Sequence, residues 1–260
     1  MTSITKRIQL GLSLVILSLT SIYPELVAQS ATGELFNNTS IGQNRTRKRV
    51  HFVTPTIKPS GSRRHGSTHS DYRTGGASRG DCPMVKKPLT ALIPDTNIGL
   101  TISEHPTLWF YIPYTAVNNR SAELVLLDEK NKLVYSTALP LAKTSGITKV
   151  TIAKTLEIGK TYKWVFSVIC NPANRTGDKF VKGEVRRELL SSAVQNQLKE
   201  VTEEHDRAII YAENGLWFDA LTSLAELRLK APQDQNFIEE WADLLGEIGL
   251  ADIASEDFVL

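Results

Sequence analysis

The stretch YKWVFSVI, residues 162–169, carries the clearest structural pattern in the sequence. Successive side chains of a β-strand point to opposite faces of a sheet, so residues two apart share a face. The large apolar side chains of this stretch are two apart: Tyr162, Trp164, Phe166 and Val168. This alternation predicts a long strand with one face buried.

Shorter segments of the same kind lie on both sides of this stretch, separated by turn residues. They cover 90–93, 98–102, 108–112, 123–127, 133–139, 148–152 and 180–187. The tripeptide Glu129-Lys130-Asn131 between two of them is a good hairpin turn, with Asn where φ is positive. Seven or eight short strands with no helical period between them are typical of two-sheet domains. We therefore predict an antiparallel β-sandwich over residues 81–188.

The segment LEIGKTYKW, residues 156–164, resembles one corner of fibronectin-type and immunoglobulin-type sandwiches. In that corner a Leu and a Gly precede a Tyr, which begins a central strand and hydrogen-bonds back to the turn. Leu156, Gly159 and Tyr162 stand at those positions here. The pair of cysteines that usually bridges the two sheets around a Trp is missing. The resemblance implies a fibronectin-like or immunoglobulin-like sandwich.

The chain has two cysteines, Cys82 before the first expected strand and Cys170 at the end of the 162–169 strand. Neither lies in a Cys-x-x-Cys motif or a Cys/His cluster, so a metal site is not indicated. In an oxidising compartment two cysteines more often form a disulfide. We predict this disulfide, with two buried free thiols as the alternative.

After residue 187 the apolar period becomes helical. We expect helices over 192–200, 203–213, 217–229 and 236–248, with Ser191 or Ser192 capping the first, Thr202 capping the second and Asn214-Gly215 ending it. Several residues recur with the spacing of a tetratricopeptide-like helix pair: Ala208, Tyr211, Ala220, Leu224, Leu227 and Pro232. One such pair is unstable alone. We therefore predict a tetratricopeptide-like region, residues 189–260, docked on the sandwich, and an α+β fold class.

Residues 1–30 have the layout of a secretory signal peptide. Lys6 and Arg7 precede an apolar run over residues 8–22, and small residues follow around Ala28. The run is shorter than the roughly 20 apolar residues that a membrane-spanning helix needs. We expect an exported protein of the periplasm or cell envelope, with cleavage after Ala28 or Ser30. An uncleaved anchor is the alternative.

Residues 31–80 are rich in Ser, Thr, Gly, Asn and Arg, and no apolar period runs through them. Nine Lys or Arg residues and one acidic residue lie between 40 and 80, whereas 81–260 has 19 basic and 25 acidic residues. Such a segment cannot bury enough surface to offset the entropy of ordering it. We predict a disordered basic linker, whose partner would be an anionic membrane surface or a cell-wall polymer. An exported chain argues against nucleic acid.

Five segments of the folded part are similar, as a set, to one known family. They are residues 88–94, 107–114, 162–170, 211–221 and 241–245. Together they resemble the Domain of Unknown Function 928 (DUF928) family of cyanobacterial exported proteins, from about residue 80 to residue 254. The resemblance implies a cyanobacterial origin and a periplasmic or envelope location. It implies no activity, because the family has none established.

Familiar catalytic signatures are missing from the sequence. There is no Gly-x-Ser-x-Gly elbow, no His-Glu-x-x-His helix and no Gly-rich phosphate loop. His105 and His205 have no recognisable orienting partner, and we interpret both as surface histidines. A hydrolase would need two carboxylates across a cleft, and it stays as the alternative function. Its candidates are Glu104, Asp128, Glu184, Glu213 and Asp219. No cofactor motif and no metal-ligand cluster is found.

Four aromatic residues stand close together in the 107–114 segment: Trp109, Phe110, Tyr111 and Tyr114. They cannot all face one core, so either the helical region or a ligand covers one face of that strand. The candidate binding residues are Trp109, Tyr111, Tyr114 and Trp217. We therefore expect a non-enzymatic periplasmic binding or scaffolding module, with another envelope protein as its partner.

Overall fold

The structure is a computed structural model of the 260-residue chain, and it describes residues 48–57, 72–75, 81–117 and 120–259. The predicted signal peptide and most of the predicted linker lie outside the described residues. The described part contains two β-sheets and four α-helices, so the fold class is α+β. No helix in this part is both long enough and apolar enough to cross a bilayer.

The smaller sheet has three strands in the order β1-β3-β6, and both of its pairs are antiparallel. Its strands are β1 (Thr90–Ala91), β3 (Thr107–Ile112) and β6 (Gly146–Thr151). Strand β3 is buried on both faces, since Leu108 to Ile112 are all at most 7% exposed. The sheet is therefore covered on both sides.

The larger sheet has five strands in the order β2-β8-β7-β4-β5. Its strands are β2 (Ile98–Thr101), β4 (Ser121–Leu127), β5 (Leu133–Pro140), β7 (Thr161–Ile169) and β8 (Lys179–Arg187). The β2–β8 pair is parallel, so the prediction of a wholly antiparallel arrangement is wrong at this edge. A hairpin turn makes neighbouring strands antiparallel. Strands β2 and β8 are far apart in sequence, and no turn sets their direction.

The two sheets share one apolar core. Phe110 of β3 stacks on Phe166 of β7 with ring centroids 4.1 Å apart, and it meets Trp164 edge-on at 5.6 Å. Gly183 of β8 makes room for Trp164, because a Cβ atom at residue 183 would lie 2.4 Å from the indole ring. The alternating side chains that predicted the 162–169 strand are thus the centre of this core.

Two local predictions in the β region are confirmed. The hydroxyl of Tyr162 accepts a hydrogen bond from the backbone N–H of Glu157 at 3.2 Å, which closes the predicted corner. Gly159 in that corner has φ +77°, a value that favours glycine. Strands β4 and β5 form the predicted hairpin, and Asn131 in its turn has φ +62°.

The four helices follow the predicted order: α1 (Ser192–Glu200), α2 (Glu204–Glu213), α3 (Trp217–Lys230) and α4 (Gln235–Glu247). Ser191 caps α1 as predicted, since its Oγ accepts a hydrogen bond from Val194 N. The prediction that Thr202 caps α2 is wrong, because the capping position falls on Glu203, whose side chain makes no capping bond. Gly215, with φ +72°, follows α2 at the predicted stop.

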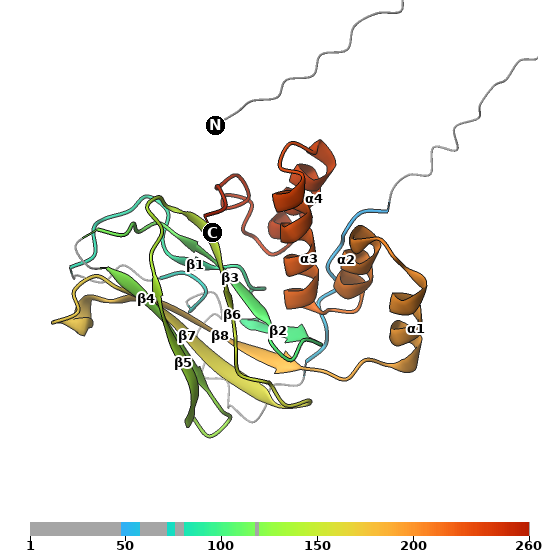
Figure 1. The fold of residues 1–260 in the computed structure, drawn as a ribbon, viewed down its shortest axis with the longest axis horizontal. Helices are drawn as coiled ribbons and strands as arrows, with labels where there is room; N and C mark the ends of the chain where they lie inside the picture. The colour runs from blue at the N-terminus through green and yellow to red at the C-terminus, as the bar shows by residue number, and fades with distance from the viewer. Residues whose placement is uncertain (1–47, 58–71, 76–80, 118–119, 260) are drawn as a thin grey trace, which may run out of the picture. The chain divides into compact units, whose positions relative to one another are not determined.

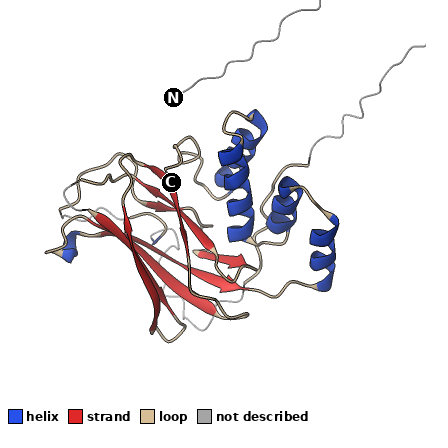
Figure 2. Ribbon diagram, in the orientation of Figure 1, coloured by secondary structure: helices blue, strands red, loops and turns tan. Residues whose placement is uncertain are grey.

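Helix α3 packs against β2 and β3, at the place where the two sheets meet (Figures 1 and 2). Two indole N–H groups bridge this contact. Trp109 Nε1 donates to Thr222 Oγ1 at 3.0 Å, and Trp217 Nε1 donates to the backbone oxygen of Leu92 at 2.9 Å. Both tryptophans are buried, so these bonds satisfy donors that would otherwise be costly to bury.

Two parts of the predicted 31–80 linker belong to the fold. Val50 and Phe52 are 2% and 7% exposed. Farther along, Arg73 Nη1 donates to the oxygen of Ile248 at 2.6 Å, and Gly75 N donates to the oxygen of Leu89 at 2.7 Å. The prediction of disorder is therefore wrong for residues 48–57 and 72–75. These short segments are ordered by surfaces far away in sequence, which composition cannot reveal.

Candidate functional site

Residues 48–57, here called the strap, cross helices α2 and α4 as one extended segment (blue in Figure 1). Two backbone N–H groups fix the strap. Val53 N donates to the oxygen of Ala212 near the end of α2 at 3.1 Å, and Phe52 N donates to Glu247 Oε2 at the end of α4 at 2.8 Å. The helices thus bind an extended polypeptide partly through its main chain.

The buried side chains of the strap, Val50 and Phe52, are two residues apart, and Pro55 also faces the helical region. The Phe52 ring packs edge-on against Trp217, with centroids 4.8 Å apart. Pro55 lies against Gly215, where a Cβ atom would be 3.0 Å from the proline ring. Val53 is 47% exposed. Trp217, a predicted binding residue, is therefore the contact for the aromatic side chain of the strap.

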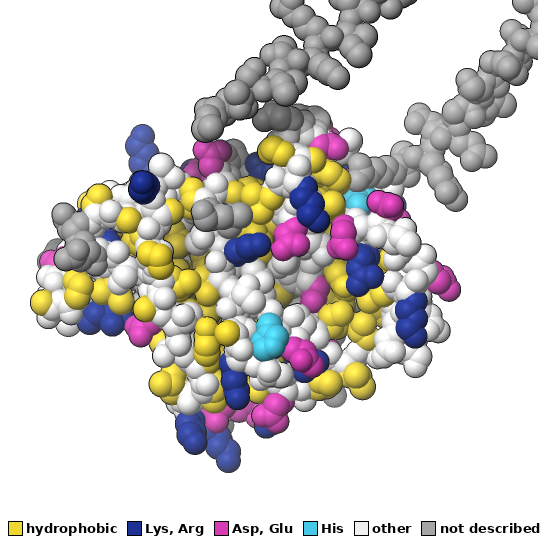
Figure 3. Space-filling model, in the orientation of Figure 1, with side chains coloured by type: hydrophobic (Ala, Val, Ile, Leu, Met, Phe, Trp, Pro, Cys, Tyr) yellow, Lys and Arg dark blue, Asp and Glu magenta, His cyan; other side chains and the backbone are white. Residues whose placement is uncertain are grey.

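The basic end of the strap meets four acidic residues, here called the acidic helical face: Glu213, Glu239, Asp243 and Glu247. Lys48 pairs with Glu213 at 2.5 Å. Arg49 pairs with both Glu239 at 2.8 Å and Asp243 at 2.7 Å. His51 Nδ1 lies 2.6 Å from Glu247. Figure 3 shows acidic and basic side chains side by side over the helices.

Three of these acids are four residues apart on α4, so they form one like-charged row. Like charges at this spacing destabilise an isolated helix by about 0.2–0.5 kcal/mol per pair. The basic side chains of the strap offset that repulsion. Exposed ion pairs contribute at most about 1 kcal/mol each. The charges therefore set the direction and register of the strap, while Val50 and Phe52 anchor it.

The other three predicted binding residues are core residues. Trp109, Tyr111 and Tyr114 are 1%, 6% and 3% exposed, so they form no exposed stacking surface. Trp109 lies under α3 through its bond to Thr222, and its ring meets Phe258 edge-on at 5.7 Å. The sequence left open whether the helical region or a ligand covers β3, and helix α3 of the helical region covers it at Trp109.

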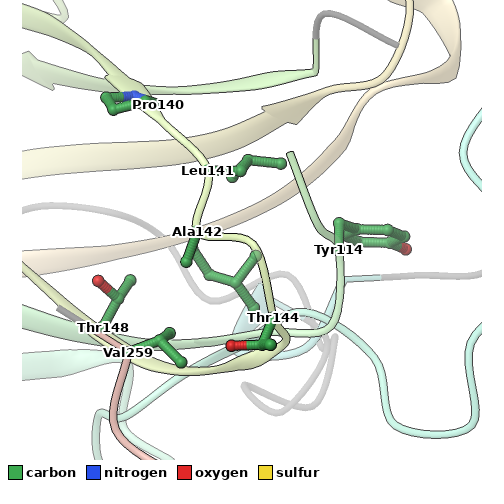
Figure 4. A pocket seen from close by; sticks show the side chains of 8 residues that line it. Tyr114, Pro140, Leu141, Ala142, Thr144, Thr148 and Val259 are labelled. Carbon is green, nitrogen blue, oxygen red and sulfur yellow. The ribbon is translucent and has the colours of Figure 1, made fainter. Parts of the chain in front are cut away.

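A small cavity lies beside Tyr114 (Figure 4). It is lined by Ile112, Tyr114, Pro140, Leu141, Ala142, Thr144, Thr148 and Val259. Its volume is about 30 Å³. That is the volume that about one water molecule occupies in the liquid, so neither a sugar ring nor a peptide side chain fits.

A larger recess lies between the segment joining β2 to β3 and helices α2 and α3. Its volume is about 160 Å³. We call it the Asp219 recess, and its lining residues are Thr101, Ser103, His105, Pro106, Thr107, Tyr211, Phe218, Asp219, Thr222 and Ser223. Asp219 Oδ2 accepts a hydrogen bond from Ile102 N at 3.1 Å. Burial raises the pKa of Asp219 from 3.8 to about 6, and the hydrogen bonds from Ile102 and Thr101 offset this only in part.

Two other carboxylates considered for the alternative hydrolase make separate contacts. Glu104 pairs with Arg187 at 2.9 Å, and Glu213 binds the strap. The interpretation of His205 as a surface residue is wrong, since His205 is 7% exposed and its Nε2 lies 2.7 Å from Glu240, which is 1% exposed. The partner lies on another helix, 35 residues away, where sequence spacing gives no hint of it.

The predicted disulfide is confirmed, because Cys82 and Cys170 are bonded. It ties the segment before β1 to the end of β7. Within the described ranges, no three His, Cys, Asp or Glu side chains are grouped so that they could hold a metal ion.

In the residues that the structure describes, these features define an α+β protein with two sheets, a disulfide and four helices, three of which contact an extended segment of the same chain. The family model described as Domain of Unknown Function (DUF928) matches residues 74–258, and the chain belongs to this family. No curated protein matches the sequence. The strap precedes the matched residues, whereas the acidic helical face lies within them.

The raised pKa of Asp219 predicts a pH dependence of stability. The Asp219 carboxyl group binds a proton more tightly in the folded state than in the unfolded state. Its contribution to the free energy of unfolding is therefore fully present below pH 4 and is lost as the pH rises to about 6. We expect wild type to lose about 2 kcal/mol relative to Asp219→Asn between pH 4 and pH 7. Urea unfolding across that range measures the difference. The other titratable groups that line the recess, His105 and Tyr211, are present in both wild type and Asp219→Asn, so their titration cancels in the comparison. Parallel pH profiles would contradict this assignment.

Proposed function

We propose that this protein is a non-enzymatic binding or scaffolding module of the cell envelope. In this proposal the acidic helical face and Trp217 hold an extended segment of another envelope protein. The sheets would form a fibronectin-like sandwich that carries α2 and α3 as a tetratricopeptide-like pair. The observation that supports this function is the strap itself, because an extended polypeptide already lies on this face through main-chain, apolar and charged contacts.

The strap also suggests the chemistry of the partner segment. Arg49 carries the charge that pairs with two acids of α4. Val50 and Phe52 are the buried side chains, two residues apart. A partner of the same kind would present a basic residue followed by two apolar residues at alternate positions, the second aromatic to contact Trp217. Alternation of this kind is what an extended peptide offers to one surface.

A partner must compete with the strap. A segment of the same chain meets its site at an effective concentration of the order of millimolar. A partner segment of similar intrinsic affinity therefore binds weakly while the strap is in place. Loosening the strap should raise partner binding, which distinguishes an exchangeable occupant from a purely structural one.

The test uses a labelled peptide of residues 46–57 and fluorescence anisotropy on the full chain. In Phe52→Asp a charge replaces the buried anchor, so the strap should leave the helices. We expect this variant to bind the peptide at least about tenfold more tightly than wild type does, because the tethered competitor is gone. Val53→Asp is the matched control, since Val53 is 47% exposed on the same segment. It should behave like wild type.

Absence of peptide binding to a folded Phe52→Asp protein would count against the proposal, and so would equal binding to all three proteins. Circular dichroism checks that the variant is folded. Crosslinking and pull-down from envelope extracts with Phe52→Asp as bait would then identify partners. Their crosslinked segments should have the basic and alternating apolar pattern.

The basic linker is the basis of a second proposal, attachment to an anionic surface. Three of its nine basic residues, Lys48, Arg49 and Arg73, already contact the folded part. The other six lie outside the described residues, and they are the ones left for such an attachment. Salt screens attraction of this kind within a Debye length of about 10 Å at 0.1 M.

A further inference from the structure

The Asp219 recess has an unusually hydroxyl-rich lining. Six of its ten lining residues carry a hydroxyl group: Thr101, Ser103, Thr107, Tyr211, Thr222 and Ser223. His105 and Asp219 add an imidazole and a carboxyl group, and Phe218 and Pro106 are the two apolar residues. The volume of about 160 Å³ equals that of roughly five water molecules in the liquid, which suits a short polyol or part of a single sugar ring.

Two of these hydroxyl groups are held in place by hydrogen bonds from residues that do not line the recess. Thr222 Oγ1 accepts from Trp109 Nε1 at 3.0 Å, and the Tyr211 hydroxyl accepts from Arg207 at 3.0 Å. A hydroxyl that accepts one such bond keeps its own proton and a second lone pair. Thr222 and Tyr211 can therefore still donate a hydrogen bond. Fixed polar groups of this kind lower the entropy lost when a ligand binds.

The imidazole of His105 is oriented in the same way. Its Nδ1 lies 3.2 Å from the backbone oxygen of Ile152, so Nδ1 is the donor and a neutral ring has its lone pair on Nε2. The lining then offers both donors and acceptors, and a single carboxyl group, that of Asp219, as its acidic member. Hydroxyl groups of a ligand can match such a mixture, because each both donates and accepts.

We propose that the Asp219 recess binds a small neutral polyhydroxy compound, either a polyol or one ring of a saccharide. A carboxylate in the lining disfavours anionic ligands, and an apolar ligand would leave the buried polar groups of the lining without hydrogen-bond partners. Glycoside hydrolysis needs a pair of carboxyl groups, and one carboxyl group lines this recess. The recess is therefore a binding site, separate from the acidic helical face.

Saturation-transfer NMR on the full chain tests this with four probes: glycerol, methyl glucoside, N-acetylglucosamine and gluconate. We expect a neutral probe to bind with a dissociation constant in the millimolar range, and gluconate to bind at least about fivefold more weakly. Binding of glycerol alone would indicate a polyol site, and binding of the ring probes a saccharide site. At about 50 mM, a probe with a millimolar dissociation constant is largely bound. Failure of all neutral probes to bind at that concentration would overturn the proposal.

Two variants locate the site. Ser223→Phe fills the recess and should weaken binding of the neutral probe at least about tenfold, whereas Glu226→Phe, on the same helix outside the lining, should not. Thr107→Val, which removes a lining hydroxyl without adding bulk, should weaken binding about threefold and gives a second readout if Ser223→Phe is unstable. Unchanged binding in folded Ser223→Phe and in Thr107→Val would overturn the assignment. Added to Phe52→Asp, neither change should affect binding of the 46–57 peptide, so the two proposals can fail separately.

Discussion

Replacement of His205 by alanine is expected to lower the free energy of unfolding by about 3–5 kcal/mol, because it leaves a buried carboxylate without its partner. His205 on α2 and Glu240 on α4 are 7% and 1% exposed, and the atoms that join them are 2.7 Å apart. Glu240 is almost fully buried, so little hydration replaces the lost contact. Helices α2 and α4, which both contact the strap, are thus also joined to each other by a polar pair.

Chemical denaturation at pH 7 measures this loss, and two variants provide controls. Glu240→Gln keeps a hydrogen-bonding side chain of the same shape and should cost much less than His205→Ala. His105→Ala removes an exposed histidine and should change the unfolding free energy by less than about 0.5 kcal/mol, as is usual for surface changes. A loss below 1 kcal/mol in His205→Ala would show that the pair has little energetic importance.

The β region was predictable because its signals are local. Alternation over residues 162–169 placed one set of side chains in the core, and the structure buries Tyr162, Trp164, Phe166 and Val168 there. The corner and the β4–β5 turn depend on residues within nine positions of each other. The parallel pairing of β2 with β8 was not predictable, since pairing between distant strands depends on the whole core and on no local turn.

The positions of the four helices could be predicted from the apolar period and the capping residues. That the helices hold the strap could not be predicted. Val50 and Phe52 read as isolated apolar residues in a basic linker until the helices supply a surface for them. One signal was available in the sequence: Glu239, Asp243 and Glu247 are spaced to form a single acidic row on α4. That row predicts a basic partner, although it does not say that the partner is the strap.

In the candidate sites too, features that depend on local sequence could be predicted, and features that depend on long-range contacts could not. Aromatic residues at consecutive positions of β3 correctly indicated that both faces of the strand are covered. The sequence could not decide between a helix and a ligand as the cover, because Thr222 lies 113 residues beyond Trp109. The Asp219 recess went unrecognised for the same reason, since the segment after β2 and helix α3 meet only in the folded chain.

Removal of the disulfide is the second change with a large expected effect. Replacing Cys82 and Cys170 together by alanine should destabilise the fold by about 4–5 kcal/mol in the chain-entropy model, because the bond closes a loop of nearly ninety residues. The sequence separation of the two cysteines is 88. Both are buried, so alanine fits the space they leave with little rearrangement. Urea unfolding of the double variant, compared with wild type under non-reducing conditions, measures the effect.

Reduction of the wild-type protein provides an independent route to the same quantity. If the bond acts mainly by restricting the unfolded chain, wild type in excess dithiothreitol should unfold at the urea concentration of the double variant, and the variant should not respond to dithiothreitol. The bond joins the segment before β1 to the end of β7, the strand that carries the core alternation. Its loss should therefore lower the stability of both sheets and not only that of one loop. Fluorescence of the buried tryptophans should then report a single unfolding transition. A double variant within 1 kcal/mol of wild type would mean that contacts around β7 hold the 81–90 segment without the covalent link.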